Sequence, residues 1–207
     1  MSPARPPEGA RTAARQREAT PVTTLMVRCD AAAPQPWRNG GGVTRELLAL
    51  PAGADWRVRI SIADIESDGP FSAFLEVERW FAVLEGAGVD LRVAGTAHRL
   101  RLGDAPLRFN GGAATDCRLL DGPTRDLNLM LRGATGSMRC AVDAAAWQPG
   151  AAQCGLFSRV AGRCVADGAA FELLAGTLLW FDPAPAMLVF SAGQRAAAGS
   201  GWWLEAS

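Results

Sequence analysis

The sequence predicts an all-β protein whose short strands close into sandwiches or barrels. From Leu25 onward, apolar or alternating runs recur at short intervals, separated by clusters of Gly, Pro, Asp and Asn, which is typical of strands joined by turns. No stretch keeps a 3.6-residue apolar period over three turns, so long amphipathic helices are not expected. Many short strands at close spacing favour a β-sandwich or barrel architecture.

The individual strands follow from this punctuation. Residues 56–62 alternate with period two, which places Trp56, Val58, Ile60 and Ile62 on one face of a strand. Residues 81–84 and 89–93 flank Glu85-Gly86-Ala87-Gly88, which predicts a β-hairpin. Further strands are predicted at residues 98–102, 107–109, 126–132, 140–142, 171–174, 178–181 and 187–190.

The order of these strands predicts two cupin-like (jelly-roll) barrels in one chain. From Phe81 to Phe109, a strand, a glycine turn, a second strand, Gly-Asp and another strand follow one another, which is the rhythm of a jelly-roll cupin unit. Residues 171–176 echo residues 81–86, and further strands follow each segment. We therefore expect a first barrel with a ligand pocket at residues 24–136 and a second, structural barrel at residues 137–207. Residues 1–23 hold four Pro and almost no large apolar side chain, which predicts a disordered tail.

Composition excludes several classes of function. The 21 basic residues balance the 21 acidic ones, which argues against direct nucleic-acid binding. The chain has no stretch of eighteen uncharged apolar residues and no apolar core of a secretory signal, so we expect no membrane partner and a cytoplasmic location.

Histidine and cysteine usage limits the chemistry further. The single histidine, His98, cannot supply the imidazoles of a typical metal site. The five cysteines are odd in number and form no Cys-x-x-Cys pair, so a disulfide framework or structural zinc is not expected. We predict no metal, no cofactor and no catalytic residue.

Two segments carry candidate binding residues. Trp37 to Glu46 contains three consecutive glycines, which permit close approach of the backbone to a ligand, and Arg38 and Asn39 beside them can hold a carboxylate or an amide. The alternative is a tight turn entering a strand. In residues 126–132 the leucines take one face, while Asp126, Asn128, Met130 and Arg132 take the other. That mixed face suits a barrel interior that holds a small ligand, or else a half-exposed strand.

Four segments in order resemble the HutD/Ves family: residues 37–46, 56–63, 68–74 and 126–130. The resemblance implies a bicupin fold, a cytoplasmic bacterial protein, and a link to histidine utilisation or stress response, without an established catalytic activity. It also implies binding of a small acidic metabolite of the histidine pathway that limits expression of that pathway. This chain has Leu75-Glu76 where the family usually has Pro-Gly, which puts the geometry of that loop in question.

We expect the pocket in the first barrel, because the later strands offer mainly apolar side chains that would fill a barrel. Arg59, Arg79 or Arg132 would pair with a ligand carboxylate, because a guanidinium fork matches its two oxygens. Asn39, Arg59, Ser61 and Asn128 should converge on one concave pocket. The predicted ligand-binding set is Trp37, Asn39, Gly40, Arg59, Ser61, Ser72, Phe74, Arg79, Asn128, Met130 and Arg132.

These observations favour a metal-free bicupin that binds a small carboxylate and acts as a regulatory sensor linked to histidine utilisation. One alternative is a cupin-type enzyme, an isomerase or an acid–base catalyst acting on a small acid. Another is a protein-interaction module. The chain has seven Trp, and the adjacent Trp202 and Trp203 would serve as the anchor of an interface. For macromolecular partners, a homodimer and an unidentified regulatory protein both stay open.

Overall fold

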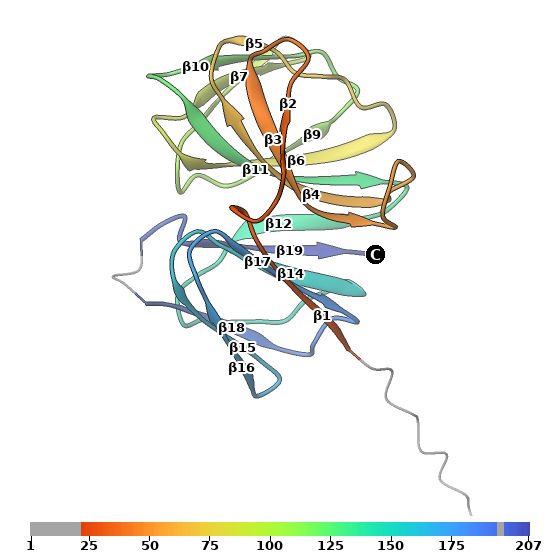
Figure 1. Cartoon of the computed structure of the whole chain (residues 1–207), viewed down its shortest axis with the longest axis vertical. Coiled ribbons are helices and arrows are strands. Elements are labelled where there is room, and N and C mark those ends of the chain that lie inside the picture. The colour runs from red at the N-terminus through yellow and green to blue at the C-terminus, as the bar shows by residue number, and fades with distance from the viewer. Residues whose placement is uncertain (1–21, 194–196) are drawn as a thin grey trace, which may run out of the picture.

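The computed structural model describes residues 22–193 and 197–207, which form two β-barrels, one above the other in Figure 1. Every helix or strand assigned in these residues is a strand, and all strand pairings are antiparallel, so the all-β prediction is confirmed. The predicted disordered tail falls almost entirely in residues 1–21, outside the described residues.

The first barrel is built from two facing sheets. One has six strands in the order β2 (Pro34–Pro36), β3 (Gly42–Leu50), β4 (Val58–Ile65), β11 (Thr124–Arg132), β6 (Val77–Glu85) and β9 (Leu107–Asn110). The other has the order β5 (Gly69–Pro70), β10 (Thr115–Leu119), β7 (Val89–Val93) and β8 (Thr96–Leu100). One end of the space between them is filled by an apolar cluster that includes Ile65, Phe81 and Leu91.

The second barrel has the same plan. Its larger sheet has the order β1 (Thr23–Arg28), β17 (Thr177–Asp182), β14 (Gln153–Ser158), β19 (Gly201–Ala206) and β12 (Gly136–Cys140). Its smaller sheet has the order β13 (Ala146–Trp147), β18 (Leu188–Ala192), β15 (Gly162–Ala166) and β16 (Ala169–Leu173). Bulky side chains, among them Leu156, Phe181, Phe190 and Trp203, fill its interior.

The two barrels repeat one topology. The order β4-β11-β6-β9 and β5-β10-β7-β8 in the first barrel matches β12-β19-β14-β17 and β13-β18-β15-β16 in the second. The expected internal repeat is therefore present, but the two similar segments found in the sequence do not lie on equivalent strands. Residues 171–176 lie at β16, which corresponds to β8, whereas residues 81–86 lie on β6. Short apolar runs followed by glycine recur in many strands, so this similarity did not identify equivalent ones.

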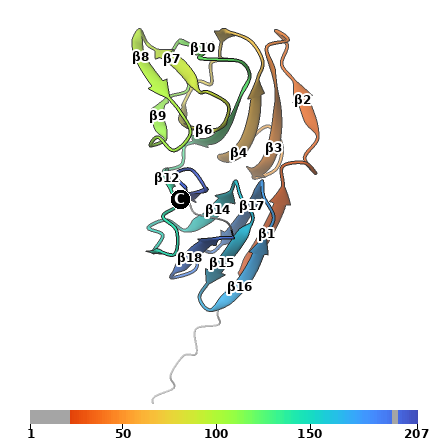
Figure 2. The same ribbon diagram turned by 90° about the vertical axis from the view of Figure 1, so that its left-hand side faces the viewer.

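The larger sheets of the two barrels pack face to face (Figure 2). Leu127, Leu129 and Leu131 of β11 lie in one buried cluster with Phe157, Trp180, Trp202 and Leu204 of the second barrel. The leucine face of residues 126–132 therefore forms part of the inter-barrel core, which leaves the opposite face for the interior of the first barrel.

Two expectations of connectivity are corrected. Residues 24–28 were expected in the first barrel, but β1 pairs along its length with β17 of the second barrel, because β17 pairs with β14 on one side only and its other edge can accept a strand. Residues 81–84 and 89–93 do not form a hairpin, since β6 pairs with β9 and β11 while β7 pairs with β8 and β10. The turn between them, where Gly86 and Gly88 adopt positive φ, carries the chain from one sheet to the other.

Candidate functional site

A cavity of about 610 Å³ opens into the first barrel over the concave face of the six-stranded sheet. Its floor comes from β4, β6 and β11, and its rim from the segment 35–39 and the loop that follows β5. The lining residues are Gln35, Pro36, Trp37, Arg38, Asn39, Thr44, Arg59, Ser61, Ala63, Pro70, Phe71, Ser72, Phe74, Arg79, Asn128 and Met130.

Strand register explains why polar side chains meet on this floor. Asn128 lies opposite Ser61 of β4, and in the next row Met130 lies between Arg59 of β4 and Arg79 of β6. Side chains in one row across a sheet point to the same side. Two arginines thus flank one methionine inside the barrel.

Arg79 is the most enclosed cation of the site, with 8% of the residue exposed. Its guanidinium carbon lies 4.6 Å from the ring centroid of Phe71 and 5.5 Å from that of Phe109, so aromatic faces hold it in place. Its Nε donates a 2.8 Å hydrogen bond to Oδ1 of Asn128. Within residues 22–193 and 197–207 it forms no ion pair, and its terminal nitrogens have no protein acceptor. Burial lowers the pKa of Arg79 to about 10, so it stays protonated at neutral pH.

Asp126 lies behind this cation and is 1% exposed. Its Oδ1 accepts a hydrogen bond from Nδ2 of Asn128, while its buried Oδ2 has no partner in the described part of the chain. Burial raises the pKa of Asp126 to about 7, although the positive charge of Arg79 and the Asn128 hydrogen bond oppose this rise. Asp126 does not line the cavity itself, but its carboxyl group, with a raised pKa, is joined by one amide to a cation that does.

Arg59 has a different environment, because its charge is already paired. Its Nε donates a 2.7 Å hydrogen bond to Oε2 of Glu46, and a terminal nitrogen lies 3.8 Å from the sulfur of Met130. A β-bulge between Glu46 and Leu48 shifts the register of β3 at this point. Arg59 can contact a ligand, but with less unbalanced charge than Arg79.

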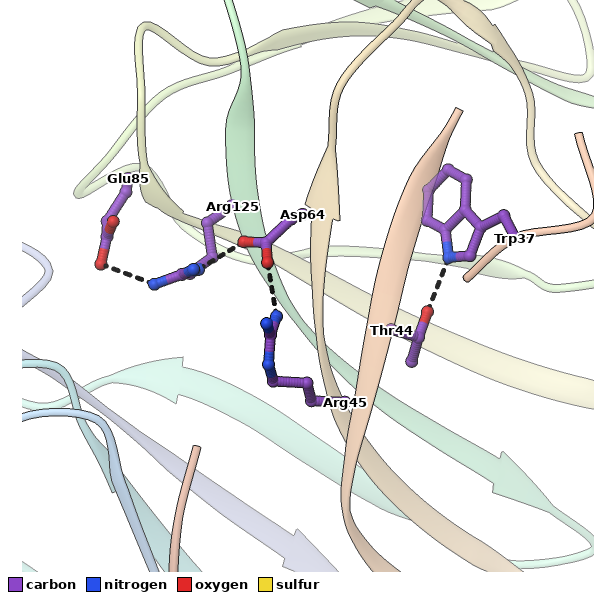
Figure 3. A network of polar contacts seen from close by, with 6 residues as sticks. All are labelled: Trp37, Thr44, Arg45, Asp64, Glu85 and Arg125. Atoms are coloured by element: carbon purple, nitrogen blue, oxygen red, sulfur yellow. Dashed lines mark hydrogen bonds and ion pairs between the residues drawn. The ribbon is translucent and has the colours of Figure 1, made fainter. Parts of the chain in front are cut away.

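The glycine turn shapes the rim of the cavity. Gly40 has φ of +70°, and its N–H donates to the carbonyl of Trp37. Trp37 donates from its indole nitrogen to Thr44 Oγ1 at 2.7 Å (Figure 3) and meets Phe71 edge to face. Asn39 uses its side-chain oxygen to accept the Gly41 N–H, which leaves its amide nitrogen available at the rim.

A second polar network braces the end of the same sheet (Figure 3). Asp64 accepts hydrogen bonds of 2.5 Å from both Arg45 and Arg125, and Arg125 also contacts Glu85. Burial alone would raise the pKa of Asp64, but the two arginine hydrogen bonds outweigh it and lower the pKa. Asp64 and Asp126 therefore have different environments. The Asp64 carboxylate is hydrogen-bonded to two arginines, whereas the Asp126 carboxylate is connected to Arg79 only through the amide of Asn128.

The structure brings most of the predicted ligand residues together around this cavity. Those that line it are Trp37, Asn39, Arg59, Ser61, Ser72, Phe74, Arg79, Asn128 and Met130. The four expected to converge, Asn39, Arg59, Ser61 and Asn128, are among them.

Two predicted residues lie elsewhere. Gly40 forms the turn but does not line the cavity. Arg132 shares the alternation of β11, but it sits at the end of the strand, where its guanidinium carbon is 4.3 Å from the Trp56 ring centroid and it donates to the Ala54 carbonyl. Alternation predicts the face of a strand but not where along the strand the cavity ends.

Several lining residues were missing from the predicted set: Gln35, Pro36, Arg38, Thr44, Ala63, Pro70 and Phe71. Arg38 is a candidate carboxylate ligand beside the glycine turn, and Phe71 lies within the segment 68–74 that resembles the family. The sequence therefore contained a reason to include both residues. Gln35 and Pro36 had none, because only the fold brings the short edge strand β2 over the cavity.

Other chemistry-bearing groups lie apart from the cavity. His98 is on β8 opposite Leu91 and does not line it. All five cysteines are free, and burial raises the pKa of Cys117, Cys154 and Cys164 to about 12. The described residues contain no group of three or more His, Cys, Asp or Glu side chains that could hold a metal ion. Nor do they include a helix long and apolar enough to cross a membrane.

The stacked jelly-roll barrels define a two-barrel cupin protein, a bicupin, with the cavity described above in the first barrel. The family model named HutD matches residues 30–198, so the chain belongs to the HutD family.

Curated relatives align over part of the chain. It is 41% identical over 99 residues to an uncharacterized 21.2 kDa protein in the hutC 3′ region of Pseudomonas putida, covering 46% of this chain and 51% of that protein. It is also 41% identical over 99 residues to Protein Ves of Citrobacter koseri, with the same coverage of each chain. The matched segment thus spans about half the length of these relatives.

Solved structures match over most of the chain. A conserved protein of unknown function from Pseudomonas aeruginosa PAO1 has 28% identity and a TM-score of 0.80, covering 89% of this chain and 99% of that one. HutD from Pseudomonas fluorescens SBW25, determined in a formate condition, has 26% identity and a TM-score of 0.76, covering 89% and 98%. Protein Ylba from E. coli, at 10% identity and a TM-score of 0.64 over 88% and 89%, shows the shared fold alone.

Proposed function

We propose that this protein binds a small carboxylate metabolite in the first barrel and acts as a sensor in the control of histidine utilisation. The observation that carries the proposal is Arg79. This guanidinium lines the cavity, is almost fully buried, and has no acidic side chain bonded to it in the described residues. A buried cation with no acidic side chain bonded directly to it favours an anionic ligand, because a direct ion pair stabilises a charge that is removed from water.

The surroundings suit a carboxylate attached to a small organic body. Because the Nε of Arg79 is bonded to Asn128, the two terminal nitrogens provide the remaining fork for two carboxylate oxygens. Ser61 and the free amide of Asn39 add polar groups, while Trp37, Phe74 and Met130 supply apolar contacts. The volume of about 610 Å³ lies within the range of small-molecule sites.

The regulatory part of the proposal rests on relatives. One is named for its place in the hutC 3′ region, and a solved neighbour is named HutD. We place the sensor in the cytoplasm, in keeping with five free cysteines. Its ligand state would be passed to a regulatory partner or through a homodimer.

Arg79 provides the direct test. We expect acetate, glutamate or urocanate to stabilise the wild-type protein in a thermal-shift screen at constant ionic strength, and isothermal titration to give Kd. Arg79→Gln should weaken binding by about 10- to 100-fold, since a hydrogen-bonded charge contributes about 1.5–3 kcal/mol. The affinity of Arg79→Lys should lie between those of the wild type and Arg79→Gln, because lysine keeps the positive charge but lacks the two parallel N–H donors of the guanidinium.

Arg132→Gln is the matched control, since it removes an arginine of the same barrel that lies outside the cavity. Its affinity should equal that of the wild type. If no carboxylate in a panel of histidine-breakdown acids binds, or if Arg79→Gln binds as well as Arg132→Gln, the proposal is wrong.

A further inference from the structure

The buried carboxyl of Asp126 has no role in the binding scheme above, yet it is joined to the proposed anion site. Nδ2 of Asn128 donates to Oδ1 of Asp126, and Oδ1 of the same amide accepts from Nε of Arg79. The amide therefore links an acid and a base that do not bond to each other directly. The second oxygen of Asp126 is buried without a partner among the described residues.

The charged and titratable groups around Asp126 come from three neighbouring strands. Arg79 of β6 attracts its negative charge, and Asp64 of β4 repels it. Asp64 projects on the opposite face of the sheet and is compensated by Arg45 and Arg125. The positive charge of Arg59 on β4 lowers the pKa of Arg79, and Cys117 of β10 is a neutral thiol at physiological pH. Arg79 is thus the main cation available to Asp126.

We infer that Asp126 is the internal counter-charge of the Arg79 site, so that a carboxylate binds there together with a proton on Asp126. The inference rests on the proposed function and deepens it, because it states what the ligand displaces. In the empty site, ionised Asp126 compensates Arg79 through Asn128. When a ligand carboxylate occupies the terminal nitrogens of Arg79, the site holds two anions for one buried cation.

Protonation removes that excess. A proton from the solvent moves onto the Asp126 carboxylate, where the unpartnered Oδ2 can carry it, and the ligand anion then pairs alone with Arg79. This also defines specificity. A ligand with one negative charge binds either together with a proton that Asp126 takes up, or to protein in which Asp126 is already protonated. The pKa of Asp126, raised to about 7 by burial, places this exchange in the neutral range.

The sign of the pH dependence follows. The ligand prefers the protein with Asp126 protonated, so affinity is constant well below pH 7 and falls as pH rises above it. For a pKa near 7, the protonated fraction drops about tenfold between pH 6 and pH 8, and affinity should drop with it. Acetate and glutamate keep the same charge throughout this range, so the pH dependence of their binding reports on the protein.

Asp126→Asn tests the inference, because an amide imitates the neutral acid and its oxygen can still accept the Asn128 hydrogen bond. Titrations with acetate and glutamate at pH 6, 7 and 8 and fixed ionic strength should show tenfold weaker binding at pH 8 than at pH 6 for the wild type. The variant should bind at pH 8 as tightly as the wild type does at pH 6. Asp116→Asn, which removes an exposed carboxylate of the same barrel, should behave as the wild type.

A measurement on the wild-type protein guards against a variant that does not fold. Titration calorimetry at pH 7 in two buffers of different ionisation enthalpy should show uptake of about half a proton per ligand. Binding that needs Arg79 but takes up no proton, or has the same pH profile with Asn at position 126, would overturn the inference and leave the proposed function standing. Absence of binding by any acid at any pH would overturn both.

Discussion

The three consecutive glycines that lead into β3 should respond very differently to the addition of one methyl group. A Cβ on Gly42 would lie 2.3 Å from the backbone carbonyl oxygen of Asp64 and 3.2 Å from two ring carbons of Trp37. On Gly41 it would meet only side-chain atoms of Ser67 and Asn39, at 3.2 Å and beyond. On Gly40 it would meet nothing within 4 Å, but the φ of +70° is unfavourable for alanine.

We therefore expect Gly42→Ala to cost about 3 kcal/mol, because a backbone atom must move to relieve the overlap. Gly40→Ala should cost about 1 kcal/mol through its φ alone, and Gly41→Ala less, since side chains can rotate away. Unfolding in urea, followed by circular dichroism, would give these differences, and the midpoint of thermal unfolding for Gly42→Ala should fall by about 6–12 °C. Equal stability of Gly42→Ala and Gly41→Ala would refute the claim that close approach of β3 to β4 requires glycine at residue 42.

Two further predictions concern stability. The pKa of Asp126 is higher in the folded than in the unfolded chain, so stability should fall as pH rises; the loss between pH 5 and pH 8 should be about 2–3 kcal/mol. Urea unfolding of the wild type and Asp126→Asn at each pH would isolate the contribution of Asp126 to stability. If the free energies of unfolding of the two proteins ran parallel with pH, the prediction would be wrong. Glu76 has φ of +60°, so Glu76→Gly should raise the free energy of unfolding by about 0.5 kcal/mol, with relief of strain exceeding the entropy cost of glycine; a less stable variant would show that lost Glu76 contacts matter more.

The loop at Leu75-Glu76 shows how far the sequence could be followed. The family resemblance places glycine where this chain has Glu76, and the backbone there keeps the left-handed conformation. Leu75 is 76% exposed, so this departure from the resemblance lies on the surface. Glu76 therefore adopts the backbone conformation that glycine favours.

Local pattern predicted many of the strands and the two faces of β11, because side-chain direction alternates along any strand. It did not single out β10, β14, β15 or β19. It could not predict which barrel β1 joins, since strand pairing depends on an edge formed more than 140 residues later in the chain. The three candidate arginines illustrate the same limit. Arg59, Arg79 and Arg132 look alike in the sequence, but the fold pairs the first with Glu46, leaves the second without an acidic partner and puts the third against Trp56.

The interior of the second barrel is packed differently from that of the first. In its interior, Trp147 stacks on Trp203 with ring centroids 4.7 Å apart, which occupies space that the first barrel leaves open. Its polar cluster is also complete: Glu205 accepts hydrogen bonds from Ser137, Arg139 and the Gly150 N–H.

β12 and β19, which carry most of that cluster, correspond to β4 and β11 of the first barrel. At the corresponding strands, the first barrel has Ser61 and Asn128 beside Arg79, whose terminal nitrogens have no acceptor in the described residues. The carboxylate of Glu205 is thus fully bonded within the second barrel, whereas Arg79 of the first barrel lines a cavity. Two barrels of the same topology therefore differ in where a charged side chain finds its partners, and this difference supports our proposal that a ligand binds in the first barrel.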